Sequence, residues 1–266
     1  MILKTKLFGH VYEFKSIREV MAKANEEKSG DKLAGIAAET AEERVAAKVV
    51  LSNLTLNDLR NCPAVPYEED EVTRIIQDSV NETIFNEYKN MTVAEFREWL
   101  LDTQTTPDMI RRASRGLTSE IVAGVCKLMS NLDLIYAAKK MRVTAHCNTT
   151  IGLPGTFSSR LQPNHTTDDP NGIIASVMEG LSLGCGDAVI GLNPVDDSVE
   201  SVARILKMFD EFKRKWEVPT QICVLAHVTT QTEAANKFGA PLALMSQSLA
   251  GSQEGNDAFG PPAASL

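Results

Sequence analysis

The spacing of hydrophobic positions along the chain changes near residue 141. From residue 16 to residue 140, apolar side chains recur every three to four positions among Ala, Glu and Lys, and this spacing predicts amphipathic helices. The residues before this region alternate apolar and polar side chains, which predicts a short β-ribbon. We therefore expect a mainly helical N-terminal region over residues 1–140 that begins with a β-ribbon.

Residues that commonly cap helices mark several of the expected helix starts. Asp31 is a candidate N-cap for a helix over residues 31–54, and Thr55 is one for the short helix that follows. Residues 67–90 and 92–102 carry the same helical spacing. A further helix is expected to start at Thr118 and to run to residue 141.

After residue 141, short apolar runs alternate with helical patterns. Helices are expected over residues 168–186, 197–219 and 231–239, the first ending at a Gly and the second starting at residue 197 or 198. This alternation predicts a parallel sheet, and hence the α/β class. The apolar runs that we expect to be strands cover residues 141–150, 187–195, 220–230 and 241–249.

The length of the second region limits its architecture. A complete β/α barrel takes about 250 residues, whereas residues 141–266 accommodate only about four βα units, the first half of such a barrel. An open half-barrel exposes two sheet edges, which is unfavourable. Two possibilities remain from the residues alone: a smaller open sheet, or a chain that is shorter than the fold it encodes.

Composition narrows the classes of function. The chain has 266 residues, of which 43% are hydrophobic and 23% charged, with a net charge of −8. These values are typical of a soluble globular protein and argue against nucleic acid or an anionic membrane surface as the partner. No run approaches the ~20 apolar residues of a membrane span. The five cysteines form no Cys-x-x-Cys pair, so we expect a reducing, cytoplasmic location.

Polar side chains follow the expected strands. Arg160 and Gln162 lie two positions apart, so an extended backbone presents both on one side. Asn193 follows the second run, and neutral polar residues close the other two at 229–231 and 246–248. Sites of α/β folds gather at such strand ends, and this set offers neutral amides, hydroxyls and one fixed cation. The alternative is that these residues satisfy backbone groups in turns.

Other chemistries have less support. His146, Cys147, Cys185 and His227 lie near strand ends but lack the spacing of metal ligands, so we expect no metal site. The chain has no Gly-x-Ser-x-Gly elbow, and no Gly-rich nucleotide loop follows the first expected strand. Asp168 and Asp169 are interpreted as the start of a helix. No pair of catalytic carboxylates stands out.

Several long segments resemble the large, catalytic subunit of ethanolamine ammonia-lyase. The similarity extends over roughly residues 1–260, so it is far more specific than a short motif. The segments that carry it are LKTKLFGHVYEFKSIREVMAKANEEKSGDKLAGIAAET, VTRIIQDSVNETIFN, NTTIGLPGTFSSRLQPN, GLSLGCGDAVIGLNPVDD and CVLAHVTTQ.

The resemblance implies a helical N-terminal region followed by a TIM-type barrel with adenosylcobalamin at its C-terminal mouth. It also implies the radical conversion of ethanolamine to acetaldehyde and ammonia. By motif, Arg160 and Gln162 are expected to contact the substrate, with Arg160 in a catalytic role at the hydroxyl oxygen, and Asn193 to bind the substrate through its amide. Pro194 and Gln247 are expected to lie against the cobalamin.

The family's chains are considerably longer, and their substrate-binding carboxylates lie in the second half of the barrel. The resemblance extends through SQSLAGSQEGNDAFG and stops before the final PPAASL. We therefore expect a truncated chain that is inactive alone. The resemblance further implies association with a small subunit and with other large subunits, and a location within a bacterial microcompartment.

Two other readings compete with a catalytic one. A half-barrel with an intact helical region can act as a non-catalytic assembly fragment that binds other large or small subunits. Alternatively, the chain is a different lyase or an aldolase on a complete small α/β fold. That reading predicts a stable monomer without cobalamin, and the length of the resemblance disfavours it.

Overall fold

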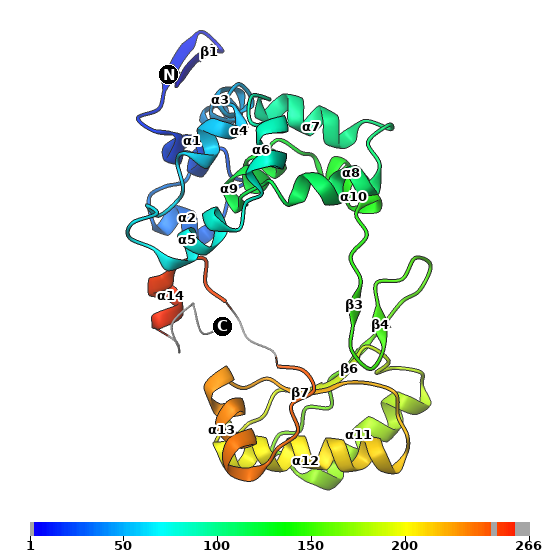
Figure 1. The fold of residues 1–266 in the computed structure, drawn as a ribbon. Coiled ribbons are helices and arrows are strands. Elements are labelled where there is room, and N and C mark those ends of the chain that lie inside the picture. Colours follow the sequence, from blue (N-terminus) through cyan, green and yellow to red (C-terminus); the bar gives the residue numbers. More distant parts are fainter. Residues whose placement is uncertain (1–2, 246–248, 259–266) are drawn as a thin grey trace. The chain divides into compact units, whose positions relative to one another are not determined.

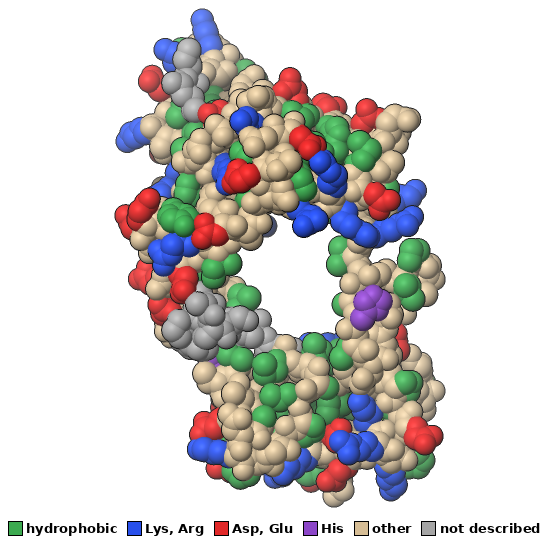
Figure 2. Space-filling model, in the orientation of Figure 1, with side chains coloured by type: hydrophobic (Ala, Val, Ile, Leu, Met, Phe, Trp, Pro, Cys, Tyr) green, Lys and Arg blue, Asp and Glu red, His purple; other side chains and the backbone are tan. Residues whose placement is uncertain are grey.

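The computed structural model describes residues 3–245 and 249–258. The chain divides into two compact units, Met1–Arg142 and Val143–Leu266. Figure 1 shows that helices make up most of the first unit, whereas the second combines helices with short strands. Figure 2 shows acidic and basic side chains interspersed over the visible face of each unit. In the described parts of the chain, no helix is long and apolar enough to cross a membrane.

The first unit begins with an antiparallel ribbon of β1 (Lys4–Leu7) and β2 (His10–Glu13). The turn between them consists of Phe8 and Gly9, both with positive φ, at 54° and 83°. A two-residue turn with both φ values positive matches the right-handed twist of the strands it joins.

Ten helices follow the ribbon in the first unit. Their bounds are α1 (Ile17–Lys23), α2 (Ser29–Leu33), α3 (Ala41–Ser52), α4 (Leu56–Arg60), α5 (Glu71–Asp78), α6 (Glu82–Tyr88), α7 (Val93–Leu101), α8 (Pro107–Ser114), α9 (Ser119–Lys127) and α10 (Asn131–Lys140).

Long helices predicted from apolar spacing are divided in the structure, because a capping residue starts a second helix partway along each of them. The helix expected over residues 31–54 is divided into α2 and α3, with Gly35 at φ 69° between them and Thr40 as the cap of α3. Asp31 lies inside α2 and is not its N-cap, so that prediction was wrong. The start predicted at Thr55 is confirmed, with a reciprocal capping box to Asp58. A cap at Ser130 likewise separates α9 from α10.

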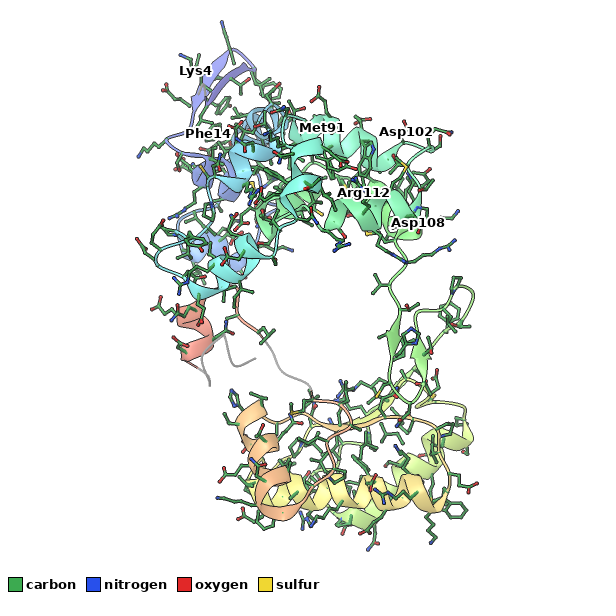
Figure 3. All side chains as sticks on the ribbon, in the orientation of Figure 1. Lys4, Phe14, Met91, Asp102, Asp108 and Arg112 are labelled. Atoms are coloured by element: carbon green, nitrogen blue, oxygen red, sulfur yellow. The ribbon has the colours of Figure 1, made fainter. Side chains whose placement is uncertain are left out.

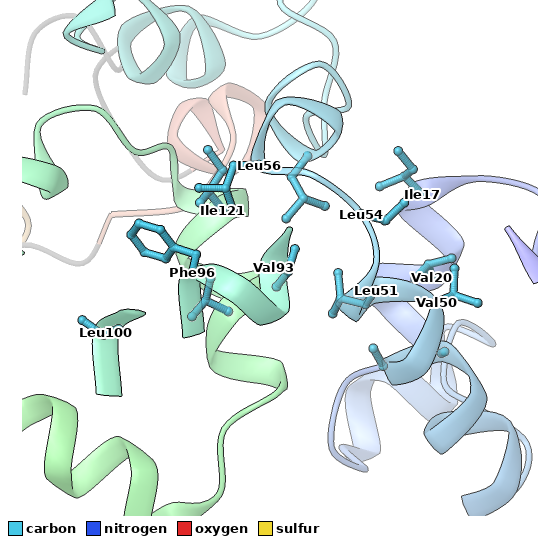
Figure 4. Packing of buried hydrophobic residues seen from close by; sticks show 14 of the residues in the cluster. Ile17, Val20, Val50, Leu51, Leu54, Leu56, Val93, Phe96, Leu100 and Ile121 are labelled. Carbon is cyan, nitrogen blue, oxygen red and sulfur yellow. The ribbon is translucent and has the colours of Figure 1, made fainter. Parts of the chain in front are cut away.

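One apolar cluster holds the helices of the first unit together. It draws buried side chains from α1, α3, α4, α7 and α9. Figure 4 shows Leu56, Ile121 and Phe96 close to one another within it. Figure 3 labels Asp102, which follows the last residue of α7, and Asp108, which lies in the first turn of α8. These residues border the loop between the two helices.

The second unit opens with an antiparallel hairpin of β3 (Ala145–His146) and β4 (Thr150–Ile151). The apolar run over residues 141–150 was predicted to be a strand of the parallel sheet, and this prediction was wrong. Cys147, Asn148 and Thr149 form the turn of the hairpin, and the chain reverses there instead of continuing along a sheet.

A three-stranded parallel sheet forms the centre of the second unit, in the order β5-β6-β7. Its presence confirms the predicted parallel arrangement, and the α/β class is compatible with the mixed helix and strand content. No closed barrel is present within residues 3–245 and 249–258. The elements of this part are β5 (Arg160–Leu161), α11 (Pro170–Ser182), β6 (Val189–Leu192), α12 (Val199–Lys215), β7 (Ile222–Val224), α13 (Val228–Phe238) and α14 (Gln253–Asp257).

The bounds of two helices in this unit follow the predicted caps. Helix α11 ends just before Gly184, which has φ 77°, and α12 starts after the N-cap Ser198. The fourth predicted strand is different: residues 241–245 contain no strand. The remainder of that run includes Gln247, which lies outside the described residues.

The two faces of the sheet differ in chemistry. Ile190 and Leu192 of β6, with Ile222 and Val224 of β7, pack against α11, α12 and α13 to form the core of this unit. Alternate residues along a strand face the opposite side. Val189, Gly191 and Cys223 therefore lie on the second face, where Val189 and Cys223 form a small buried cluster with Ala188 and Ile151 of β4.

Gln221 joins the β3–β4 hairpin to the sheet. Its side chain is 1% exposed, and its Oε1 accepts the backbone N–H of Asn148 at 2.9 Å and of Thr149 at 3.2 Å. Its Nε2 donates to Thr149 Oγ1 at 2.7 Å and to the carbonyl of Ala188. All four hydrogen-bonding positions of the amide are therefore used.

We expect Gln221→Met, which keeps the side-chain length, to lower the free energy of unfolding of the second unit by about 2–4 kcal/mol, because buried partners lose their bonds. Urea unfolding measures this change. Gln104→Met is the control, because Gln104 is exposed, and its effect is expected to stay within about 0.5 kcal/mol. Equal effects of the two substitutions would contradict the role assigned to Gln221.

Candidate functional site

Parallel pairing brings the C-terminal ends of β5 and β6 together. Arg160 lies opposite Val189, and Leu161 lies opposite Ile190. Gln162 therefore follows β5 at the same edge of the sheet at which Asn193 and Pro194 follow β6. The sequence predicted these residues to share one edge, but through a strand over residues 141–150; in the structure, β5, which was not predicted, brings Gln162 there.

The guanidinium of Arg160 crosses β6 at a residue that has no side chain. A Cβ placed on Gly191 would lie 2.9 Å from Arg160 Nη2, 3.1 Å from Arg160 Nε and 2.7 Å from Cys223 Sγ. The two separations below 3.0 Å are closer than real Cβ atoms adopt, so a side chain at Gly191 would displace a neighbour. Cys223 is fully buried whereas Arg160 is exposed. Gly191 therefore provides the space in which the guanidinium lies.

A carboxylate fixes the start of β5. Asp187 Oδ1 accepts the backbone N–H of Ser159 at 2.7 Å and its hydroxyl at 2.9 Å. The backbone bond, followed by the hydroxyl bond, lowers the pKa of the Asp187 carboxyl below its ordinary value. This anchor lies one residue before Arg160, so it holds the strand from which the guanidinium extends.

The side chains of Arg160, Gln162 and Asn193 are exposed. Their polar atoms have no hydrogen-bond partner among the residues that the structure describes. Pro194, which follows directly, is half-buried. The edge thus offers one cation and two neutral amides to a ligand, beside a rigid ring. Such a set suits hydrogen bonds to a hydroxyl, an amide or a carbonyl oxygen.

The segment that links β5 to α11 contributes Asn164, which the sequence did not single out, and Asp168, which it assigned to a helix start. Asn164 Oδ1 accepts the backbone N–H of Asn193 at 2.9 Å. Asp168 Oδ2 accepts the N–H groups of Val195 and Asp196. The predicted helix start is confirmed at Asp169, which caps α11, but Asp168 serves the neighbouring loop instead. No local pattern reveals this, because its partners lie 27 and 28 positions away.

The third predicted strand end was wrong. Thr229, Thr230 and Gln231 lie in α13, for which His227 is the N-cap through its ring Nδ1. Gln231 is fully buried and donates to the carbonyl of Ala226, so it is not a surface amide. The capping residue, His227, lies three positions after the end of β7 and starts the helix sooner than the apolar pattern indicates.

The residues considered as metal ligands are engaged locally or lie apart. His146 Nδ1 is 3.0 Å from Thr150 Oγ1 within the hairpin. Among residues 3–245 and 249–258, no group of three or more His, Cys, Asp or Glu side chains is arranged to hold a metal ion.

Comparison with known proteins identifies relatives over nearly the whole chain. A family model described as ethanolamine ammonia lyase large subunit matches residues 12–266. The large subunit of ethanolamine ammonia-lyase from Escherichia coli (strain K12) is 57% identical over 260 residues, and so is the large subunit from Salmonella typhimurium (strain LT2). Each match covers 98% of this chain and 57% of the relative. The chain therefore spans little more than half the length of these relatives.

We expect Gly191→Ala to destabilise the second unit by about 1–3 kcal/mol, because the added methyl group meets the buried thiol of Cys223. In a double-mutant cycle, Cys223→Ala should relieve part of this cost, so that the double variant is more stable than the sum of the single effects indicates. Thermal or urea unfolding of the four proteins measures the coupling.

Gly30→Ala is the control for this cycle, because no other group lies within 4 Å of a Cβ there. Replacing this helical glycine is expected to be neutral, or stabilising by up to about 1 kcal/mol. Strictly additive effects of Gly191→Ala and Cys223→Ala would contradict the contact between the two positions.

Proposed function

Because this chain belongs to the family of ethanolamine ammonia-lyase large subunits, we propose that it contributes to the conversion of ethanolamine to acetaldehyde and ammonia. In this proposal, the second unit is the first part of a TIM-type barrel, and the ends of β5 and β6 form part of the substrate site. The observation that carries the proposal is the parallel pairing of β5 and β6, which brings Gln162 and Asn193 to one edge of the sheet, with the Arg160 guanidinium across Gly191. All three side chains are exposed and have no hydrogen-bond partner among the described residues.

Arg160 is proposed to hold the hydroxyl oxygen of the substrate. Ethanolamine is a cation at neutral pH, so a guanidinium does not suit its ammonium end. A fixed cation at the oxygen instead stabilises negative charge that develops there as the substrate rearranges. The position of Arg160 across Gly191 supports this role, because the sheet directs the guanidinium without neutralising it.

Gln162 and Asn193 are proposed to orient the substrate. Amides donate and accept hydrogen bonds without releasing protons, so they align a small ligand and leave its protonation unchanged. The ammonium end needs an anion. Asp168 does not serve this purpose, because it is 3% exposed and bonded to two backbone amides. A different carboxylate must face the ammonium.

The proposed cofactor is adenosylcobalamin, which supplies, when bound, the radical that removes hydrogen from the substrate. The donor set at this edge fits such a group, because a corrin ring carries amide side chains that pair with neutral amides. Half-buried Pro194 adds an apolar surface beside Asn193. Pro194 and Gln247 are proposed to hold the cofactor, and Arg160, Gln162 and Asn193 to hold the substrate next to it.

We expect the purified chain to cause a saturable change in the visible absorbance of adenosylcobalamin, and ethanolamine to alter that change. Asn193→Ala should raise the ethanolamine concentration needed for half the effect by about tenfold, the consequence of losing one polar contact. Asn57→Ala in α4 is the control. A folded sample that leaves the spectrum unchanged at all concentrations would contradict the proposal.

A second role, in assembly, has support from one surface of the first unit. Helix α10 exposes Leu132, Ile135 and Tyr136, which lie on one stripe because they are three and four positions apart. Leu132 is 77% exposed and Ile135 is 66% exposed. Adjacent exposed apolar side chains mark interaction surfaces. We propose that this stripe contacts a second large subunit, and that the family's small subunit and a bacterial microcompartment are further parts of the assembly.

We expect light scattering after size-exclusion chromatography to give a defined oligomer, because burial of the stripe removes apolar surface from water. The double substitution Leu132→Glu and Ile135→Glu should shift the mass toward the monomer. Leu33→Glu is the matched control, because Leu33 is 90% exposed on α2. An unchanged oligomer in the double variant would exclude this stripe as the contact.

A further inference from the structure

The loop that carries Asn193 and Pro194 is held by side chains from a single neighbouring segment. In residues 193–196, three positions have a backbone N–H and Pro194 has none. The N–H of Asn193 donates to Asn164 Oδ1 at 2.9 Å. Those of Val195 and Asp196 donate to Asp168 Oδ2 at 2.8 Å and 2.9 Å. Every backbone donor of this loop thus ends on the segment between β5 and α11.

The two hydrogen bonds to Asp168 hold the 193–196 loop more strongly than the one to Asn164. Hydrogen bonds to a carboxylate are roughly twice as strong as those between neutral groups. The side chain is 3% exposed, so little water competes for its oxygens. Two adjacent N–H groups that converge on one oxygen also fix the direction of the peptide planes between them. The loop after β6 therefore has a defined path at the point where it leaves Pro194.

The segment that provides these acceptors is itself anchored. His165 Nδ1 accepts the N–H groups of Thr167 and Asp169, each at 3.3 Å. Asp169 caps α11 through the N–H of Gly172, and the His165 ring lies so close to Gly172 that a Cβ there would be 2.6 Å from it. The acceptors consequently keep their positions relative to α11.

Asp168 holds this position at a cost to local stability. Its φ is 51°, in the left-handed region that residues other than glycine rarely adopt. Its Oδ1 is buried and has no hydrogen-bond partner in the described part of the chain, which is also unfavourable. Strained backbone and unpaired polar atoms persist where surrounding structure requires them, and they gather at functional sites.

We propose that Asp168 is a positioning residue that acts through the 193–196 backbone to place the amide of Asn193 and the ring of Pro194. This inference rests on the proposed function, in which Asn193 binds the substrate and Pro194 the cofactor. Asp168 itself contacts neither, because it is buried beneath the loop that it holds. Its loss should therefore weaken ligand binding without removing any group that touches the ligand.

The test combines amide hydrogen exchange with the adenosylcobalamin titration on the full chain. Asp168→Ala should speed exchange at Val195 and Asp196 by about tenfold or more, while α12 and the sheet keep their protection. The same variant should raise the ethanolamine concentration for half the spectral effect. Asp168→Asn retains a carbonyl acceptor and tolerates the left-handed backbone, so it should restore both measurements to within about threefold of the original.

Two further variants separate positioning from general support. Asn164→Ala removes the acceptor of a single amide, so it should speed exchange at Asn193 alone, in a protein that stays folded. Asp197→Ala is the control, because Asp197 is an exposed carboxylate beside the same loop, and it should change neither measurement.

Each outcome bears on one of the two claims. Faster exchange throughout the second unit in Asp168→Ala, or no change at Val195 and Asp196, would overturn the positioning role. Faster exchange at Val195 and Asp196 with an unchanged ethanolamine response would also overturn it. If the unsubstituted chain does not respond to cobalamin or ethanolamine, the proposed function fails. The exchange data and their recovery in Asp168→Asn still decide in that case whether Asp168 fixes the loop.

Discussion

Arg160 pairs with Val189 in a parallel register, and the arrangement of the candidate site depends on this pairing. Parallel strands deliver their C-terminal ends to one edge, so Gln162 and Asn193, which are 31 positions apart, reach the same edge. The Arg160 guanidinium lies across Gly191, two residues before Asn193. The helices on the opposite face make the register costly to change, because a shift by one residue would turn Ile190 and Leu192 away from their core. The hydrophobic core thus determines where the polar groups meet.

The site also depends on groups that serve it indirectly. Gly191 contributes by having no side chain, since this absence lets the Arg160 guanidinium cross β6. Gln221 uses its whole amide to fasten the hairpin at the other end of the strands. Asp187 fastens the residue before Arg160. The apolar core already establishes the position of the sheet. Each of these three residues then adds a local hydrogen bond or leaves a local space that the site needs.

The sequence predicted those elements whose signals are local. Ser198 and Thr55 start helices because their side chains accept nearby backbone N–H groups, and a short window reveals this. The hairpin at residues 145–151 was missed because β-branched residues favour a strand whatever its partner.

Helix α13 begins at Val228, three residues before its predicted start. The sequence did not indicate this start, because the cap is a histidine, an uncommon N-cap. The role of Asp168 depends on contacts between distant segments, which no single-sequence pattern contains. The shared edge of Gln162 and Asn193 was predicted, but β5, the strand that carries Arg160, was not, because the preceding strand was expected at residues 141–150. Nothing in the sequence pattern pointed to the open space at Gly191, since a strand glycine has several possible causes.

The buried thiol of Cys223 can report how often the sheet of the second unit opens. It lies opposite Gly191 in β7 and forms no disulfide, while the other four cysteines are exposed. A bulky thiol reagent will modify those four first, and it reaches Cys223 only when the strands separate. The rate of the slow, fifth reaction then reports how often the centre of the sheet opens. That frequency is a property of the same strands that hold Arg160, and it is measurable without any ligand.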